Sequence, residues 1–253
     1  MDADTPIEAD AEDRASGEGG PSLLRAARLT ALAGGIHAVL FLVSFWLATR
    51  TPGANASDAE LVAFYTGADD RRPVLIGLYL MPFAGIAFIW FADALRVWGR
   101  GRIRRRNQFL STMQFIAGIL YVGLLFATSA AYTVTAASVE FGSSQVDPML
   151  ARLFPEYGRA LFFFFVLRMA AVFAFTTSNL LMKSGILPKW LGWIGIAVGV
   201  ILLLTPTFSD WLALVFPVWV LALSLSVLMA AGQISADAGG PSAATGQPRG
   251  GEA

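Results

Sequence analysis

Long apolar runs separated by short polar segments fill the chain from residue 25 to residue 232. Roughly 20 apolar residues in a helix cross the ~30 Å hydrocarbon layer of a bilayer. Only helices and closed barrels satisfy their backbone in lipid, and uninterrupted apolar runs predict helices. The sequence therefore predicts an all-α membrane protein, a bundle of six transmembrane helices at about 29–48, 73–97, 109–137, 161–182, 190–205 and 211–231. The fifth run is short, but Pro188 and Pro206 bracket it and we still expect it to span.

The two ends of the chain have a different composition. Residues 1–24 are strongly acidic and residues 233–253 are rich in Gly, Ala, Pro and Ser. Such segments bury too little apolar area to offset their ordering entropy, so both are predicted to be disordered tails. The N-terminal tail does not resemble a secretory signal, whose first region is basic.

Arg and Lys in the loops between spans predict the orientation. With the N-terminus in the cytoplasm, the inner loops carry more of these residues than the outer loops, mainly because of "RVWGRGRIRRRN" at 96–107. Six spans then place both termini in the cytoplasm. Arg outnumbers Lys throughout the chain, beside abundant Ala and Gly, which indicates GC-rich codons and a bacterial inner membrane.

Composition excludes several kinds of chemistry. The chain is 56% hydrophobic and 14% charged, with a formal net charge of zero, so nothing indicates binding to nucleic acid. It has no cysteine and one histidine, which argues against disulfides, thiolate metal sites and zinc or haem centres. Nucleotide-binding, zinc-protease and serine-hydrolase motifs are missing. We therefore expect no enzyme, no metal and no cofactor.

Arg168 is the sharpest candidate for function. It lies inside "FFFFVLRMAAVFAF" (162–175), ~13 Å below Arg159 at the outer end of its helix. A central arginine costs ~2.5–3.5 kcal/mol on insertion scales, so it should face the bundle interior or a cavity and find acceptors. It either binds an anionic group or ties helices together. Its possible partners are hydroxyls and one carboxylate of the third span: Thr128, Ser129, Tyr132, Thr133 and Glu140.

A second polar layer is predicted in the inner half of the membrane. His37, Asp93 and the "TTSN" stretch from Thr176 to Asn179 lie at overlapping depths. This overlap allows the side chains of His37, Asp93 and Asn179 to converge. Together they would relay a proton or hold a cation. The alternative is that His37 is a hydrogen-bonded packing residue and Asp93 pairs with a nearby arginine.

Two local motifs have structural consequences. In the outer loop, Ser57 or Asp58 is a plausible N-cap of a short interfacial helix, with Glu60 or Leu61 in its first turn. A second interfacial helix is predicted at 147–158. The G-x-x-x-G at 195–199 permits close helix approach, and we expect it to pack within the bundle.

Two stretches, "DAELVAFYTGADDRRPVLIGLYLMPFAGIAFIWFADALR" (58–96) and "LPKWLGWIGIAVGVILLLTP" (187–206), resemble pieces of uncharacterised six-helix integral membrane proteins of GC-rich bacteria, the group filed as multi-pass domains of unknown function. The resemblance implies an α-helical inner-membrane protein. It brings no active-site residues to this chain.

Two functions remain open. The first is a non-enzymatic structural or partner-binding membrane module in contact with membrane lipids, with a homo-oligomer as an open alternative. The second is a small-solute permease or lipid-binding protein that uses Arg168 for an anionic group; the residues define no substrate. The surroundings of Arg168 decide between them.

Overall fold

The computed structural model describes residues 6–99, 108–142, 145–185, 188–205 and 208–238, and this part of the chain contains helices and no strand. The elements in order are α1 (Pro6–Ala48), α2 (Asp58–Thr66), α3 (Ala68–Gly99), α4 (Gln108–Phe141), α5 (Pro148–Leu161), the π-helix η2 (Phe162–Val166), α6 (Leu167–Ser184), α7 (Lys189–Leu204) and α8 (Leu212–Ala238). The all-α prediction is confirmed.

Five helical segments are long and apolar enough to cross a membrane: Ala27–Ala48, Ala68–Val97, Gln108–Phe141, Pro148–Lys183 and Leu212–Ala230. The fifth predicted span, at 190–205, corresponds to α7, an apolar helix of 16 residues. At 1.5 Å per residue it is ~24 Å long, which is less than the hydrocarbon thickness. Length and composition therefore indicate a multi-pass membrane protein with five candidate spans.

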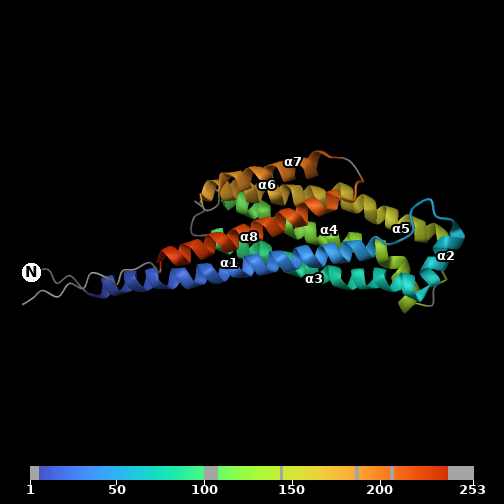
Figure 1. Ribbon diagram of the computed structural model, residues 1–253, viewed down its shortest axis with the longest axis horizontal. Coiled ribbons are helices and arrows are strands. Elements are labelled where there is room, and N and C mark those ends of the chain that lie inside the picture. The colour runs from blue at the N-terminus through green and yellow to red at the C-terminus, as the bar shows by residue number, and fades with distance from the viewer. Residues whose placement is uncertain (1–5, 100–107, 143–144, 186–187, 206–207, 239–253) are drawn as a thin grey trace, which may run out of the picture.

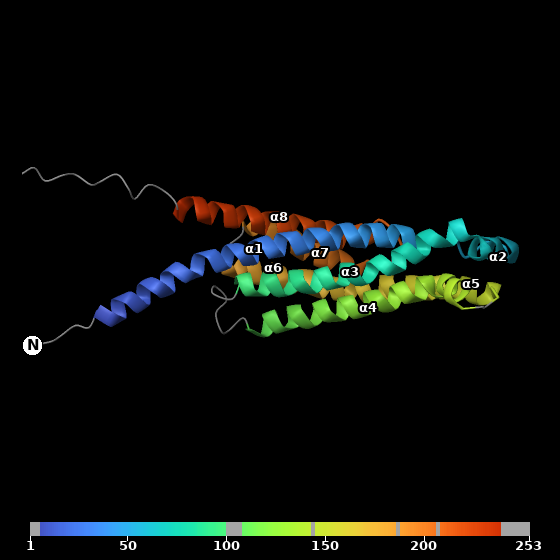
Figure 2. The same ribbon diagram turned by 90° about the horizontal axis from the view of Figure 1, so that it is seen from below.

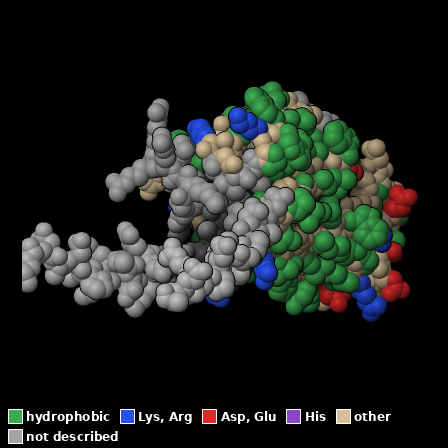
Figure 3. Space-filling model, turned by 60° about the vertical axis from the view of Figure 1, so that its left-hand side comes forward, with side chains coloured by type: hydrophobic (Ala, Val, Ile, Leu, Met, Phe, Trp, Pro, Cys, Tyr) green, Lys and Arg blue, Asp and Glu red, His purple; other side chains and the backbone are tan. Residues whose placement is uncertain are grey.

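The helices lie roughly along one axis (Figures 1 and 2). α1 packs chiefly against α3 and α8, while α6 packs chiefly against α7 and α4. The start of α3, the end of α4, α2 and α5 gather at the end of the bundle away from the chain termini (Figure 1). Among the described residues visible in Figure 3, hydrophobic side chains cover most of the surface, as expected for a surface in contact with lipid.

Both terminal helices extend into the tails that composition predicted to be disordered. α1 begins at Pro6 and α8 continues to Ala238, whereas residues 1–5 and 239–253 lie outside the described residues. Apolar burial is not needed to extend an existing helix. A helix anchored in the bundle adds one backbone hydrogen bond for each further residue that is fixed. Ala and Glu, frequent in the N-terminal tail, are strong helix formers.

The predicted break between an interfacial helix at 147–158 and a span at 161–182 is wrong. α5, η2 and α6 follow one another without a loop, so the connection from α4 to this run is the segment between Phe141 and Pro148. Asp147 caps the start of this run by accepting from the N–H groups of Met149 and Leu150. Pro155 sits inside α5, but the missing N–H does not end the helix.

The described chain divides into two regions with different chemistry. The polar cap comprises α2, the start of α3, the end of α4 and α5; its small apolar core is Leu61, Tyr65, Val74, Ala136 and Ala151. The bundle core comprises the apolar side chains between α1, α3, α4, α6 and α8. Its centre is aromatic: Phe41, Phe88, Phe91, Tyr121, Phe162, Phe173, Phe216 and Trp219 are buried and in contact.

Candidate functional site

Arg168 lies on α6, just after the π-helix. Its Nη1 donates to the carbonyl oxygen of Phe163, five residues earlier, at 2.6 Å. Its guanidinium carbon also lies 5.9 Å from the centre of the Phe164 ring. π-helical turns are often found at functional sites. Here the π-turn supplies the one hydrogen-bond acceptor that Arg168 has among the described residues.

The side chain of Arg168 is partly buried and belongs to the exposed face of its helix. Phe165 and Val172, close to it on the helical wheel, are 54% and 36% exposed. Ala170 and Phe173, on the opposite side, are buried in the bundle core. The guanidinium therefore points away from the core, contrary to the expectation that it faces the interior. We call this surface of Phe164, Phe165, Arg168, Val172 and Phe175 the α6 face. It is bordered by α7 at Phe175 and by the ring of Phe208 at Phe164.

None of the predicted partners reaches Arg168. Helices α4 and α6 run antiparallel, because Gly118 faces Phe173 and Gly158 faces Ala131 and Tyr132. Interpolation between these contacts places Arg168 level with residues 122–123 of α4, ~8 Å or more along the axis from the predicted hydroxyls. Depth counting from the loops failed because α4 extends well beyond the membrane into the polar cap.

The predicted partners instead have other surroundings. Thr133 donates to the carbonyl of Ser129 at 2.7 Å, and Tyr132 lies beside Arg159. The hydroxyls of Thr128 and Ser129 are buried and have no hydrogen-bond partner within the described residues. The Arg168 guanidinium therefore does not bond to the hydroxyls of α4 that were predicted as its partners.

Glu140 belongs to the polar cap. It forms an ion pair with Arg71, whose Nε donates to it at 2.9 Å. Arg71 also donates to the carbonyl of Tyr65 at 2.7 Å. The expected pairing of Glu140 with Arg168 is thus corrected, because the carboxylate lies far above the level of Arg168 and beside a closer cation.

All four ion pairs of the described chain involve residues of the polar cap. Besides Arg71–Glu140 they are Arg72–Asp69 (3.3 Å), Arg152–Asp58 (2.9 Å) and Arg159–Glu156 (3.9 Å). Arg168 has no carboxylate within ion-pair distance in the part of the chain that the structure describes. Within the described residues its guanidinium contacts one carbonyl, that of Phe163, and one aromatic ring, that of Phe164.

His37 is enclosed in the bundle core. Its Nδ1 lies 2.9 Å from the carbonyl oxygen of Ala84 and its Nε2 lies 3.4 Å from the hydroxyl of Tyr121. A neutral ring that donates from Nδ1 and accepts at Nε2 satisfies both contacts. The rings of Phe41 and Phe88 pack against it. This geometry favours the packing alternative for His37, a hydrogen-bonded tie between α1, α3 and α4.

The predicted convergence of His37, Asp93 and Asn179 is wrong. Asp93 is exposed on α3 and lines a surface groove with α1 and α4. Asn179 donates to the carbonyl of Phe175 in its own helix at 2.9 Å, and Thr176 likewise donates to Val172 at 2.7 Å. Similar depth did not bring these side chains together because they point in different directions around their helices.

Sequence reasoning missed two polar ties between helices. Gln114 of α4 donates to the hydroxyl of Thr177 of α6 at 2.7 Å, and Ser44 of α1 donates to the carbonyl of Gly77 of α3. Gly77 is the signal that was available, because a small residue in a span often marks close helix contact. A Cβ there would lie 2.8 Å from the backbone oxygen of Ser44.

The G-x-x-x-G motif packs within the bundle, as predicted. A Cβ on Gly195 would collide with the hydroxyl of Ser178, and one on Gly199 would lie 3.1 Å from the carbonyl of Ala171. Both contacts join α7 to α6. α7 is therefore held against α6 along most of its length.

Within the described residues no group of three or more His, Asp or Glu side chains is placed to hold a metal ion. Two embedded charges remain without a counter-charge there: Arg168 on α6 and Asp93 on α3. Comparison of the chain with protein-family models, with curated proteins and with solved structures gives no match.

Proposed function

We propose that the chain is a non-enzymatic membrane module that binds another membrane protein through the α6 face, with Arg168 at its centre. One observation carries the proposal: Arg168 points outward from the bundle within an apolar span, and among the described residues its charge meets only one carbonyl and one ring. A charge in the hydrocarbon region normally pairs with another charge or lines a water-filled cavity. The counter-charge then comes from a molecule docked on this face.

The partner we propose carries a carboxylate in a transmembrane helix. A second copy of this chain meeting it symmetrically through the α6 face would place one Arg168 near the other. At that level of α4 and α6 the described residues include no acidic side chain to separate the two cations. A different chain with Asp or Glu at the same depth supplies both charge and hydrogen-bond acceptors.

The packing of the bundle core supports a binding module over a permease. Phe88, Tyr121, Phe173 and Phe216 fill the centre where a solute would pass, and each is buried. Arg168 faces the opposite way, so it would not line such a path.

We further propose that α7 completes a set of six spans with both termini in the cytoplasm of a bacterium. The excess of Arg and Lys in the loop after α3 supports this orientation. A periplasmic reporter such as alkaline phosphatase, fused after Ser57 or Val146, is expected to be active. A fusion at either position that is active only as a cytoplasmic reporter would overturn the topology.

Site-specific photo-cross-linking in the native cells tests the docking face. A photoreactive amino acid at Val172 is expected to yield one discrete adduct with another membrane protein, and the same group at Ile36, exposed on α1, is not. Arg168→Met should abolish the Val172 adduct, because it keeps an unbranched apolar stem and removes the charge. Arg168→Lys should retain part of it.

Three results would contradict the proposal. An adduct at twice the mass of the chain would indicate a homo-oligomer. An adduct that survives Arg168→Met would show that the charge is not involved. Retention of anionic phospholipid by the purified wild type but not by Arg168→Met, with no protein adduct, would favour lipid binding instead.

A further inference from the structure

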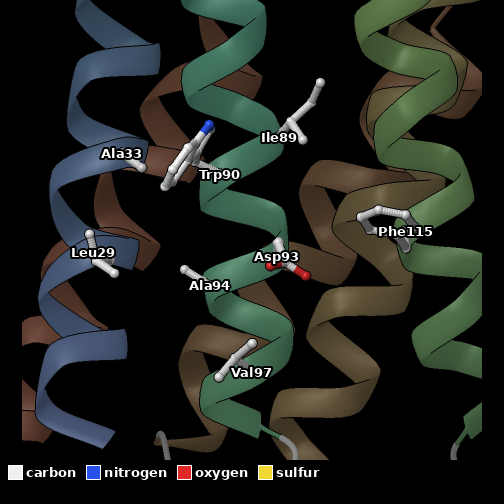
Figure 4. A pocket seen from close by; sticks show the side chains of 8 residues that line it. All are labelled: Leu29, Ala33, Ile89, Trp90, Asp93, Ala94, Val97 and Phe115. Carbon is white, nitrogen blue, oxygen red and sulfur yellow. The ribbon is translucent and has the colours of Figure 1, made fainter. Parts of the chain in front are cut away.

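A groove of about 370 Å³ crosses the exposed face of α3 in the half of the bundle nearest the chain termini. Its walls come from α1 on one side and α4 on the other (Figure 4). Eight residues line it, seven of them apolar: Leu29, Ala33, Ile89, Trp90, Asp93, Ala94, Val97 and Phe115. Small-molecule sites are typically apolar concavities of ~300–1,000 Å³ with a few polar groups that orient the ligand.

Asp93 is the charged group of this groove. Its side chain is exposed, and its carboxylate lies between the ribbons of α3 and α4, on the side of Phe115 (Figure 4). It takes part in none of the ion pairs and hydrogen bonds found among the described residues. Arg96, the nearest cation in the sequence, instead lies over the Phe115 ring, with its guanidinium carbon 5.2 Å from the ring centre.

From this geometry we infer that the groove binds a single-chain amphiphile with an ammonium head. The head pairs with the Asp93 carboxylate, and the alkyl chain lies over Ala33, Ile89 and Trp90. Charge complementarity selects a cation, because an acidic group in an apolar groove is otherwise left without a counter-charge. This site is separate from the α6 face and does not depend on it.

The aromatic residues of the groove support an ammonium head over other cations. Trp90 lines the groove on the side of α1 and Phe115 on the side of α4, with Asp93 between them (Figure 4). The faces of aromatic rings attract ammonium groups within about 6 Å. The Phe115 ring already has one cation over it, that of Arg96. An alkyl chain also matches the apolar lining, which a hydrated metal ion would not.

The volume of the groove selects a ligand with one chain. At about 370 Å³ it lies near the lower end of small-molecule sites, so it suits one alkyl chain and a compact head. A phospholipid with two acyl chains or a docked helix with a lysine would need a much larger surface. These occupants are distinguished below.

Binding of dodecyltrimethylammonium to the purified full-length chain in neutral nanodiscs tests the inference, with isothermal titration calorimetry for affinity and native mass spectrometry for stoichiometry. One molecule per chain is expected. Dodecyl sulfate and dodecanol, which have the same chain length but an anionic or neutral head, should bind at least about tenfold more weakly, because the charge-assisted contact is lost.

Two variants locate the site on exposed side chains, so that the bundle core stays intact. Asp93→Asn should weaken binding of the ammonium probe about tenfold or more. Trp90→Leu should weaken it about threefold or more, because it removes the largest aromatic face. Asp93→Glu should restore most of the affinity. Asp70→Asn, which removes an exposed carboxylate in the polar cap, is the matched control and should leave affinity unchanged, as should Arg168→Met.

The inference is overturned if the three probes bind equally, or if Asp93→Asn binds the ammonium probe like the wild type. It is also overturned if the wild type binds none, as expected when a partner helix covers the groove. The purified chain could also retain a two-chain lipid that depends on Asp93 and prevents binding of the probe. That result would contradict a single-chain ligand and assign the groove to a phospholipid.

Discussion

The polar cap and the bundle core handle charge in opposite ways. In the cap, each of the four ion pairs joins residues of the same chain, and Arg71 combines Glu140 with backbone carbonyls. In the bundle, polar side chains mostly bond to nearby backbone oxygens, as His37 and Ser44 do, and the centre is filled by aromatic rings.

This difference follows from the solvent outside each region. Water and salt at the cap screen charges, so an exposed ion pair there contributes little and costs little. Lipid offers no hydrogen bonds, so a charge in the bundle is expensive unless it is paired. Arg168 and Asp93 are the two exceptions in the bundle. Because an unpaired charge there is expensive, these two residues indicate function more strongly than any charge of the cap.

The largest effect is expected where the bundle is tightest. Gly77→Leu places a side chain against the backbone of Ser44 and Ala48, with the first carbon 2.8 Å from both. Backbone cannot rotate aside, so we expect a loss of about 3 kcal/mol in the free energy of unfolding, seen as a lower thermal midpoint. Gly123→Leu is the control, because its Cβ meets open space. Equal midpoints for both variants would contradict the close approach of α1 and α3.

Glu140→Gln tests the strongest pair of the cap. It leaves the Arg71 guanidinium, whose side chain is 11% exposed, without its counter-charge. We expect a loss of about 1–2 kcal/mol, confined to the cap, because Glu140 itself is 38% exposed and partly screened.

Hydrogen exchange of α2 and of the first turns of α3 measures this local loss. Asp69→Asn is the control: its partner Arg72 is exposed, and the change should stay within about 0.5 kcal/mol. If Glu140→Gln lowered protection across the bundle, the two regions would not be independent.

Ser57→Ala sharpens the comparison within the cap. The Ser57 side chain accepts from the N–H of Glu60, and the Glu60 carboxylate accepts from the N–H of Ser57 at 2.7 Å. Loss of such an N-cap costs about 1 kcal/mol, so the amides of α2 should exchange about fivefold faster. Ser57→Thr retains the oxygen and should behave like the wild type. No change in Ser57→Ala would contradict the capping box.

The smallest effect on stability at neutral pH is expected from the ionisation of Tyr65, which changes stability only in alkaline solution. Burial in the cap raises the pKa of the Tyr65 phenol to about 12, above its ordinary value near 10. The neutral phenol is therefore favoured by folding, and its contribution is complete below pH 10 and is lost as the pH rises from 10 to 12.

Unfolding of the cap measured against pH is expected to show this loss, at about 1.4 kcal/mol per pH unit within that window. Tyr65→Phe should remove the dependence without cost at pH 7, because the hydroxyl has no hydrogen-bond partner among the described residues. A dependence that persists in Tyr65→Phe would assign it to another group.

Much of the fold follows from the sequence. The predicted spans agree with α1, α3, α4, α6, α7 and α8 to within a few residues at many ends, and Ser57 with Glu60 forms the expected cap of α2. The packing of Gly195 within the bundle was also expected, and the structure identifies α6 as its partner. These features depend on hydropathy and local backbone chemistry, which a linear sequence contains.

Hydropathy and composition along the chain already show that it is helical, that it is apolar enough to cross a membrane several times, and that Arg168 and Asp93 are unusual there. The direction in which each charge faces depends on tertiary contacts. The rotation of α6 turned Arg168 outward, the length of α4 carried Glu140 to Arg71, and α1 and α4 built walls around Asp93. Depth can be counted along a chain, but direction depends on contacts between helices far apart in sequence.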